Sequence, residues 1–405
     1  MERASRLLQH IATGAALNRQ DEDVVILGCK RTPICKAKRG GFRDTPAGDL
    51  LEAVLRSVVE EAGIASEEVE DVVVGNVLAD QGILMARTAQ LLADIPHTVP
   101  TVTLNRQCAS GLQAIMTVAG EIRTGTIDLG IGAGVESMSE RSMDQIRPKV
   151  CEPRLASRRG SIKRISPGLA DKSSASGSGK RLRRKLTYLL RAAKAQASNG
   201  FVREIVPTLS RVKGEDGELV PGPVVVEDDG IRPQTTAEKL GKLRPAFKPD
   251  GSTTAGNSSQ VSDGAAAVLL ASRRKARELG LQPRARIVAS AVCGVPPDIM
   301  GIGPAVAIPK VLEKAGMRMD DIDVFEINEA FASQAVYCVE ELGVPREKLN
   351  PRGGAIALGH PLGCTGARQV VTLIHYLEDN NLNTGIVSMC VGMGMGAAAI
   401  IALEH

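Results

Sequence analysis

The sequence predicts a layered α/β protein built from two similar halves. Its 405 residues exceed one ordinary hydrophobic core, so two or three packed units are expected. Apolar residues make up 43% of the chain and aromatic residues only 2%, so Ala, Val, Ile and Leu must fill the interior, with backbones packed closely at many glycines. Stretches with strand character alternate with helical ones, which favours parallel strands joined by crossover helices.

Two short segments hold matching places in the two halves. Residues 105–112 (NRQCASGL) and 359–366 (GHPLGCTG) each close an apolar, β-prone stretch and open a helical one. Three pairs of matching residues stand 252 positions apart: Cys108 and His360, Asn76 and Asn328, and Gly111 and Gly363. This constant offset indicates an internal duplication. A duplication that puts a thiol in one half and an imidazole at the matching place in the other can build a nucleophile and its base across a pseudo-twofold axis.

Hydrophobic periodicity places the elements of the first half, which begins with a strand at Val24–Leu27. Later strands are expected at Val69–Val77, Thr101–Leu104 and Leu129–Gly134, and helices at Asp49–Ala62, at Met85–Ala93 and from Cys108 to about Thr124. Residues 201–254 are expected to form loops and short strands, and an apolar strand follows at Val261–Ser272.

The second half starts near Arg286 and repeats this order. The expected helices are Ala305–Ala315, Glu329–Leu342 and Pro361–Leu377, and the expected strands are Asp323–Ile327, Ala355–Leu358 and Ile386–Met389. We therefore divide the chain into four parts. They are an N-terminal appendage (1–21), a first half (22–138 with 255–285), an inserted loop domain (139–254) and a second half (286–405).

One segment differs in composition from the rest. Residues 141–194 hold sixteen Lys and Arg against three acidic residues, whereas the net charge of the whole chain is only +4. The stretch is rich in Ser, Gly and Arg, and it has no apolar period that buries a face. A solvated segment, a contact for phosphates and a nucleic-acid-binding patch at Lys180–Lys185 are all consistent with it. We favour the first and expect no nucleic-acid partner.

Composition excludes several classes of protein. The eight cysteines contain no C-x-x-C pair and lack the close spacing of zinc sites or secreted disulfide frameworks, so we expect free thiols in a reducing compartment. No run approaches the roughly 18–20 apolar residues that span a bilayer, and the N-terminus lacks the hydrophobic core of a secretory signal. We therefore expect a soluble protein without a membrane span.

Cys108 is expected at the start of a helix. Unpaired amide groups and the helix dipole there favour a thiolate over a thiol, as a nucleophile requires. A free cysteine is also among the most often buried residue types, so Cys108 alone fits a packing role as well.

His360 lies between Gly359 and Pro361 at the matching helix start, a site that lets an imidazole point out of the sheet. The chain has only five histidines. The other four fit surface, packing or appendage positions: His10, His97, His375 and His405.

Cys390 precedes a glycine-rich run, residues 391–396 (VGMGMG), in which Gly392 can offer an unobstructed amide. Close helix–strand packing explains most runs of this kind, and no Lys-Ser/Thr follows it as in a phosphate-binding loop. Asn328 ends a buried strand, where a helix cap and a water-holding group for an oxyanion are both consistent with it.

Taken together with residues 300–304 (MGIGP) and 254–264 (TAGNSSQVSDG), these residues resemble the thiolase family, most closely the peroxisomal 3-ketoacyl-CoA thiolases of animals. The likeness covers nearly all of 22–140 and 199–405. It implies a duplicated α-β-α-β-α layered fold with two pseudo-twofold-related halves and an inserted loop domain, and it implies a homodimer.

The resemblance implies an acyl-transfer mechanism. Cys108 would accept the acyl group of a 3-ketoacyl-CoA with His360 as its base, and Cys390 would be the second acid and base. The products would be acetyl-CoA and an acyl-CoA two carbons shorter, as in fatty-acid β-oxidation. One oxyanion would be stabilised by His360 and a water held by Asn328. The other would be stabilised by the amides of Cys108 and Gly392. A thiol pKa modestly below its usual 8.5 would suit this work.

The resemblance also implies the substrate contacts. Ser259 would line the pantetheine tunnel, and Met300 and Phe331 would contact the substrate. Coenzyme A would itself be a substrate, and no metal or other cofactor is implied.

The N-terminus has a targeting pattern. Arg3-Ala4 followed five residues later by His10-Ile11 is similar to the N-terminal peroxisomal targeting nonapeptide, although Ala4 and Ile11 depart from its commonest form. We therefore expect a peroxisomal protein whose appendage binds the import receptor. A mitochondrial presequence and a frayed terminus are the alternatives.

The family pattern is lost between about 141 and 191 and returns at residues 192–196 (AAKAQ). Such a loss at nearly unchanged length indicates a reading-frame slip in the predicted gene or a divergent insert. If the segment is genuine, part of the acyl and CoA cover is missing, so we expect poor order there and lower substrate affinity.

Other functions stay open at this stage. An acetoacetyl-CoA thiolase would use the same four catalytic positions. A catalytically silent thiolase-like protein would keep the dimer scaffold as an interaction or lipid-carrier module, and the altered loop favours it while the intact catalytic set argues against it. β-Ketoacyl synthases pair their cysteine with two histidines or with His and Asn, so Cys390 argues against them.

Overall fold

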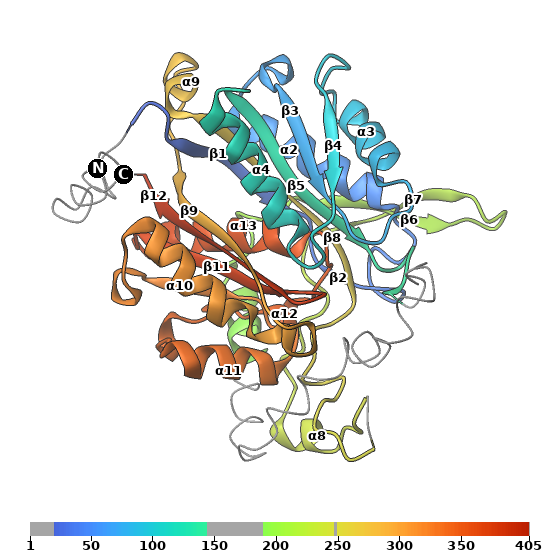
Figure 1. Cartoon of the computed structure of the whole chain (residues 1–405). Helices are drawn as coiled ribbons and strands as arrows, with labels where there is room; N and C mark the ends of the chain where they lie inside the picture. Colours follow the sequence, from blue (N-terminus) through green and yellow to red (C-terminus); the bar gives the residue numbers. More distant parts are fainter. Residues whose placement is uncertain (1–19, 144–188, 247–248, 405) are drawn as a thin grey trace, which may run out of the picture.

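The computed structural model describes residues 20–143, 189–246 and 249–404, and every structural statement below concerns these residues. The targeting pattern and most of the atypical basic segment lie outside them. Figure 1 shows residues 20–143 in blue and teal, mostly above the elements of residues 303–404 in orange and red.

The main sheet follows the strand order β10-β11-β12-β9-β1-β8-β5-β3-β4. The first-half strands are β1 (Val24–Arg31), β2 (Cys35–Lys36), β3 (Asp71–Gly75), β4 (Thr101–Leu104), β5 (Leu129–Ser137) and β8 (Ser262–Ser272). The second-half strands are β9 (Ala285–Gly294), β10 (Val324–Ile327), β11 (Thr384–Val391) and β12 (Met395–Leu403). The two groups meet where Val25 and Ile26 of β1 pair with Arg286 and Ala285 of β9.

Helices cover the outer faces of the first-half and second-half parts of this sheet and fill the space between the two parts. The helices are α2 (Ala47–Ala62), α3 (Gly82–Leu92), α4 (Ser110–Thr124), α8 (Ala237–Gly241), α9 (Arg273–Glu278), α10 (Gly303–Ala315), α11 (Ala332–Leu342), α12 (Ala355–Leu358) and α13 (Thr365–Asp379). One core cluster joins α2 and α3 to the outer face of the first-half sheet, and another joins α10 to the outer face of the second-half sheet. The third joins α4 and α13 to both inner faces. These contacts stack five layers in the order α-β-α-β-α.

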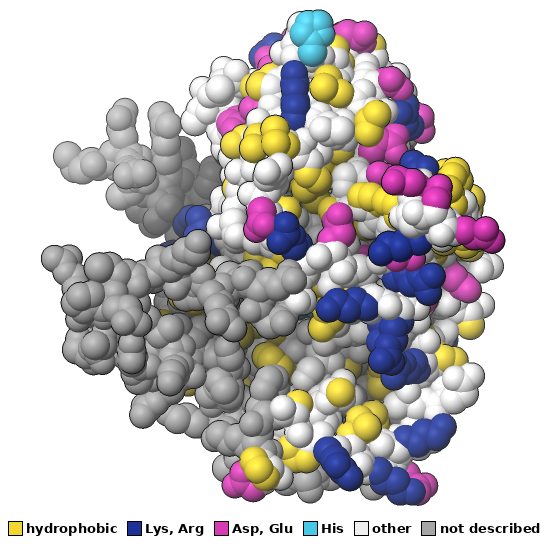
Figure 2. Space-filling model, turned by 90° about the vertical axis from the view of Figure 1, so that its right-hand side faces the viewer, with side chains coloured by type: hydrophobic (Ala, Val, Ile, Leu, Met, Phe, Trp, Pro, Cys, Tyr) yellow, Lys and Arg dark blue, Asp and Glu magenta, His cyan; other side chains and the backbone are white. Residues whose placement is uncertain are grey.

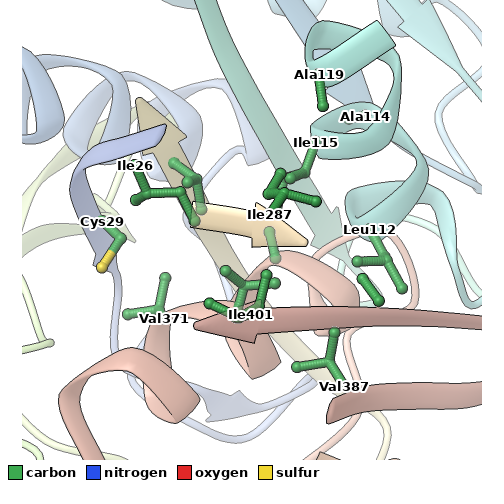
Figure 3. Packing of buried hydrophobic residues seen from close by; sticks show 14 of the residues in the cluster. Ile26, Cys29, Leu112, Ala114, Ile115, Ala119, Ile287, Val371, Val387 and Ile401 are labelled. Carbon is green, nitrogen blue, oxygen red and sulfur yellow. The ribbon is translucent and has the colours of Figure 1, made fainter. Parts of the chain in front are cut away.

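Alternation along the strands explains this stacking. In β8, Ala266, Val268 and Leu270 face the central helices, whereas the residues between them face α2. Residues of β8 are buried on both faces, as expected for a sheet covered by helices on each side. Figure 3 shows the central layer, where Leu112 and Ile115 of α4 lie near side chains of both halves.

Most predicted elements are confirmed, and β4 occupies the predicted residues. The expectation of parallel strands is only partly right. β3, β4 and β5 run parallel, as do β10 and β11, but the central strands β1, β8, β9 and β12 pair antiparallel.

The predicted strand at Ala355–Leu358 is wrong, because these residues form the helical turn α12. All four are buried, and a short apolar run has no period that separates a strand from a buried turn. A residue outside the turn stabilises it, since the Ile356 amide donates a hydrogen bond to Glu329 Oε2 at 3.3 Å. His360 therefore follows a turn rather than a strand.

The inserted segment contributes the hairpin of β6 (Thr208–Lys213) and β7 (Leu219–Val225) and is anchored by a buried arginine. Arg31 donates to both oxygens of Asp228, at 2.7 and 2.9 Å, and to Glu204 Oε1 at 2.6 Å. All three side chains are buried. None of the helices in the described ranges combines the length and the apolar character that a membrane span requires.

Candidate active site

Cys108 lies in a tight loop between β4 and α4. Gln107, directly before it, has a φ of 48°, which is uncommon for a residue with a side chain. The loop is held by its own polar groups, since the Arg106 amide donates to Ser110 Oγ at 2.9 Å and that hydroxyl donates to the Gln107 carbonyl at 2.7 Å. This geometry presents the half-buried Cys108 just ahead of the helix start.

Two backbone amides point at the Cys108 sulfur. They belong to Cys108 itself and to Gly392, and both lower the pKa of the thiol. Burial acts more strongly in the opposite direction, and the nearby Glu136 carboxylate adds to it, so the pKa of Cys108 is raised. The expected lowering of this pKa is therefore wrong, because loss of hydration outweighs the helix start. The resting group is a thiol.

His360 is buried at the start of the loop that leads into α13. Its Nδ1 lies 2.6 Å from Thr365 Oγ1, and its Nε2 lies 3.3 Å from Asn328 Nδ2. Gly359 has a φ of 119°, and a Cβ there would lie 2.2 Å from Ser262 Oγ, so only glycine fits at this position. Burial, with a smaller contribution from Arg368, lowers the pKa of His360 to about 3. The imidazole is thus neutral and able to accept a proton.

Cys390 is the buried penultimate residue of β11. Burial raises the pKa of its thiol well above the usual value, and the next contributions come from Cys108 and Cys338. The influence of Cys108 on this pKa indicates that the two cysteines predicted from opposite halves lie near each other. The strand then turns through Met393 and Gly394, with φ values of 70° and 90°, which leaves the Gly392 amide directed at Cys108.

The two halves touch at the glycines predicted to match. A Cβ on Gly111 would lie 2.6 Å from the Gly363 carbonyl oxygen, and one on Gly366 would lie 2.4 Å from the Leu112 nitrogen. The starts of α4 and α13 therefore pack backbone to backbone. The apolar cluster against which Cys108 packs includes Leu362, two residues after His360.

Sequence reasoning did not identify Glu136 as part of this region. Its Oε2 accepts from the amides of Val77 and Gly363 at 3.1 and 2.9 Å, and its Oε1 accepts from the Leu78 amide and Asn76 Nδ2 at 3.1 Å each. Burial raises its pKa to about 7. The sequence offers one signal for it, a single carboxylate in a strand (residues 129–137) that has only Ser137 as its other polar side chain.

The other predicted site residues lie on neighbouring loops. Asn328 follows β10, and its Oδ1 is buried without a hydrogen-bond partner among the described residues. The Ser259 amide donates to the Ala330 carbonyl at 2.9 Å, and the adjacent Ser258 pairs with Phe331, so this loop lies against the start of α11. Met300 is half-buried on the 3₁₀ helix Pro297–Ile302, which packs against α11 and β11.

No group of three or more His, Cys, Asp or Glu in the described part of the chain is arranged to hold a metal ion. The chemistry of the region is that of thiols, one neutral imidazole, an amide side chain and backbone N–H groups.

Comparison with known proteins agrees with this geometry. The model of the thiolase N-terminal domain matches residues 24–173 and 189–274, and that of the thiolase C-terminal domain matches residues 281–403. The chain belongs to the thiolase family. Human peroxisomal 3-ketoacyl-CoA thiolase is 53% identical over 385 residues, which cover 93% of this chain and 90% of the relative.

Solved thiolase structures confirm the fold. The dimeric peroxisomal thiolase of Saccharomyces cerevisiae superposes with a TM-score of 0.86 at 42% identity, covering 97% of this chain and all of the other. A second structure of that yeast's peroxisomal 3-ketoacyl-CoA thiolase, with a TM-score of 0.77 at 39% identity, covers 96% of this chain and all of its own. It is a five-layered α-β-α-β-α structure made of two core domains of identical topology, as predicted for this thiolase.

Proposed function

We propose that this thiolase cleaves 3-ketoacyl-CoA with coenzyme A, giving acetyl-CoA and an acyl-CoA two carbons shorter. The observation that carries the proposal is that two thiols from opposite halves, the half-buried Cys108 and the buried Cys390, interact electrostatically, with the Gly392 amide aimed at Cys108. One thiol can hold the acyl group while the other moves a proton.

The first half-reaction forms an acyl-enzyme. His360 takes the proton of Cys108 as the sulfur attacks the 3-keto carbon, and the bond between C2 and C3 of the substrate then breaks. The electron pair leaves on C2 as the enolate of acetyl-CoA, which takes a proton from Cys390. Because the resting pair is a neutral thiol and a neutral imidazole, proton transfer accompanies the attack instead of preceding it.

The second half-reaction transfers the acyl group to coenzyme A. The Cys390 thiolate takes the proton of the incoming CoA thiol, and the CoA sulfur attacks the thioester carbonyl. The bond to Cys108 breaks, and its sulfur recovers the proton from His360. The CoA proton replaces the one that Cys390 gave to acetyl-CoA, so every catalytic group regains its starting protonation state, and the cleavage involves no net oxidation or reduction.

Two backbone amides and the side-chain oxygen of Asn328 can stabilise the negative charges that develop on substrate oxygens. The N–H groups of Cys108 and Gly392 converge on the Cys108 sulfur, so a carbonyl oxygen bound beside that sulfur can accept from them. The unpartnered Asn328 Oδ1 can accept a hydrogen bond from a water molecule. The other hydrogen of that water and the protonated His360 would then both donate to the thioester oxygen of the enolate.

Coenzyme A is a polyanion, and cationic side chains lie around Lys36, together with the carboxylate of Asp229. Lys36 has its pKa lowered by burial and then by the neighbouring Arg232 and Arg39, so three positive charges cluster there. Lys36 pairs with Ser262, against which Gly359 packs. We place the CoA phosphates at this cluster, and the pantetheine chain along Ser259 with the acyl group toward Met300 and Phe331.

The subunits would associate through the edge of the first-half sheet. β4 is the end strand, and large apolar side chains on it and on α3 are exposed: Ile83, Leu84, Leu91, Leu92 and Val102. Figure 2 shows the side on which α3 and the β6–β7 hairpin lie in Figure 1, with hydrophobic side chains spread over its upper part and Lys and Arg along one edge of its lower part. Exposed apolar patches beside an unpaired strand favour association of two copies. Leu84→Glu is expected to yield monomers in sedimentation velocity, and a variant that stays dimeric refutes this interface.

We assign the protein to the peroxisome, in agreement with the peroxisomal relatives, with the import receptor as its partner through Arg3–Ile11. A fluorescent fusion of residues 1–20 should co-localise with peroxisomes, and an Arg3→Glu fusion should not. Mitochondrial localisation of the first fusion contradicts the assignment.

The direct test of function is CoA-dependent loss of the 3-ketoacyl-CoA enolate absorbance across a series of chain lengths. Turnover confined to acetoacetyl-CoA identifies the short-chain alternative. A folded dimer without turnover on any chain length contradicts the proposal and favours the silent thiolase-like protein. Cys108→Ser should abolish turnover without changing the fold, and persistent activity in that variant rejects Cys108 as the nucleophile.

A further inference from the structure

Each of the two nitrogens of the His360 ring lies within hydrogen-bond distance of a neighbouring side chain. Thr365 Oγ1 lies 2.6 Å from Nδ1, and Asn328 Nδ2 lies 3.3 Å from Nε2. All three side chains are buried, so water does not compete for the contacts. The position of the single ring proton is therefore set by these two neighbours.

The Thr365 hydroxyl has one hydrogen, and a second contact accounts for it. Oγ1 lies 2.9 Å from the carbonyl oxygen of Pro361, four residues earlier, and a carbonyl can only accept. When the hydroxyl donates to Pro361, it offers a lone pair to Nδ1, so Nδ1 must carry the ring proton. Nε2 then holds the lone pair, which accepts from the Asn328 amide group.

We propose that Thr365 is a positioning residue that keeps neutral His360 in the tautomer with its proton on Nδ1, so that the lone pair on Nε2 can take the proton of Cys108. The role in turnover rests on the proposed function. The same hydroxyl lone pair also serves after proton transfer, because Nδ1 remains a donor in the imidazolium. The contact at Nδ1 therefore persists throughout the reaction, whereas the Asn328 amide group gives up its contact with Nε2 once that nitrogen is protonated.

The helix start makes this contact rigid. Thr365 is the first residue of α13, and its branched side chain has few rotamers. The next residue, Gly366, packs against the backbone of Leu112 so closely that a Cβ would lie 2.4 Å from its nitrogen. The backbone of His360 is fixed as well, since its amide donates to the Gln260 carbonyl at 2.9 Å.

Three variants separate the hydroxyl from the shape of the side chain. Thr365→Val keeps the branched shape but removes the hydroxyl, and Thr365→Ser keeps the hydroxyl. Thr117→Val is the matched control, because Thr117 on α4 makes the same contact to a carbonyl four residues earlier, at 2.9 Å, without touching a histidine. We expect kcat of Thr365→Val to fall about 10²-fold with KM changed less than about 3-fold. Thr365→Ser and Thr117→Val should stay within about 3-fold of the parent. An active Thr365→Val, or an equal loss in Thr365→Ser, overturns the proposal.

The tautomer can be read without turnover. Solid-state ¹⁵N spectra of the full-length protein with labelled histidine rings, assigned by loss of a signal in His360→Asn, report which nitrogen of His360 is protonated at pH 7. We expect a protonated Nδ1 in the parent and in Thr365→Ser, and a proton moved wholly or partly to Nε2 in Thr365→Val. A proton on Nε2 in the parent overturns the proposal. If the spectra behave as expected while the parent cleaves no 3-ketoacyl-CoA, the proposed function fails and the positioning of the ring stands.

Discussion

Gly363 is the residue at which the joining of the two halves can be tested most sharply by substitution. A Cβ at this position would lie 2.5 Å from the Val135 oxygen, 2.8 Å from the Gly75 oxygen and 2.9 Å from the Asn76 Cα. All three are backbone atoms of the first half, held in or beside β3 and β5. They cannot turn aside as a flexible side chain does, so Gly363→Ala must separate the halves locally.

The cost follows from the size of the overlap. Overpacking by one carbon costs about 1–3 kcal/mol when side chains can adjust, so we expect about 3 kcal/mol where three backbone atoms resist. For units of this size, that corresponds to a fall in Tm of about 6–12 °C. The displaced loop also carries His360, and small shifts of a reacting group are costly, so kcat should fall at least about tenfold.

Gly120→Ala is the matched control. Gly120 lies inside α4, and a Cβ there meets no atom within 4 Å. Alanine in a helix interior is about 0.5–1 kcal/mol more favourable than glycine, so this variant should gain stability and keep its activity. Calorimetry and thiolysis rates of both variants provide the comparison. A Gly363→Ala protein with the Tm and kcat of the parent would refute the backbone contact between the halves.

Further predictions concern the buried arginine and the two thiols. Arg31→Met should lower the free energy of unfolding by about 3–5 kcal/mol in denaturant titration, because Asp228 is left buried without its cation and Glu204 keeps only the cation of Arg352, and an unchanged midpoint would contradict the anchoring role. The raised pKa of Cys108 keeps it a thiol at pH 7, so its alkylation by iodoacetamide should climb about tenfold per pH unit from pH 7 to 9. A rate already level near pH 6 would indicate a thiolate–imidazolium pair instead. Cys390→Ala should lower turnover about 10²–10⁴-fold while Cys108 is still alkylated at the parent rate, and slowed alkylation would show that the substitution disturbs Cys108 itself.

The sequence predicts the pairing of the two halves because duplication keeps the loops at which strands end and helices begin. The 252-residue offset correctly matched Gly111 with Gly363, and the structure places these glycines in contact. The limits of the four parts of the chain stay a prediction.

Short apolar segments were harder to predict. The turn at Ala355–Leu358 was mistaken for a strand, since its form depends on the distant Glu329 carboxylate. β12 was not foreseen, because its run of Gly and Ala has little strand propensity and is stabilised by pairing with β9 and β11.

Electrostatics depended on tertiary structure in the same way. A helix start alone favours a thiolate at Cys108, but the depth of burial, which a linear pattern does not give, reverses the shift of its pKa. Glu136 was overlooked for the same reason, since its four donors come from two segments far apart in the sequence, residues 76–78 and Gly363.

The central claim is that Cys108 carries the acyl group, and trapping the acyl-enzyme tests it most directly. The protein is mixed with one equivalent of a 3-ketoacyl-CoA without free CoA, quenched, digested and analysed by mass spectrometry. We predict one equivalent of acetyl-CoA and an acyl chain two carbons shorter on Cys108, which added CoA removes. Acyl groups on another residue, or acetyl-CoA release without any covalent intermediate, would contradict this account.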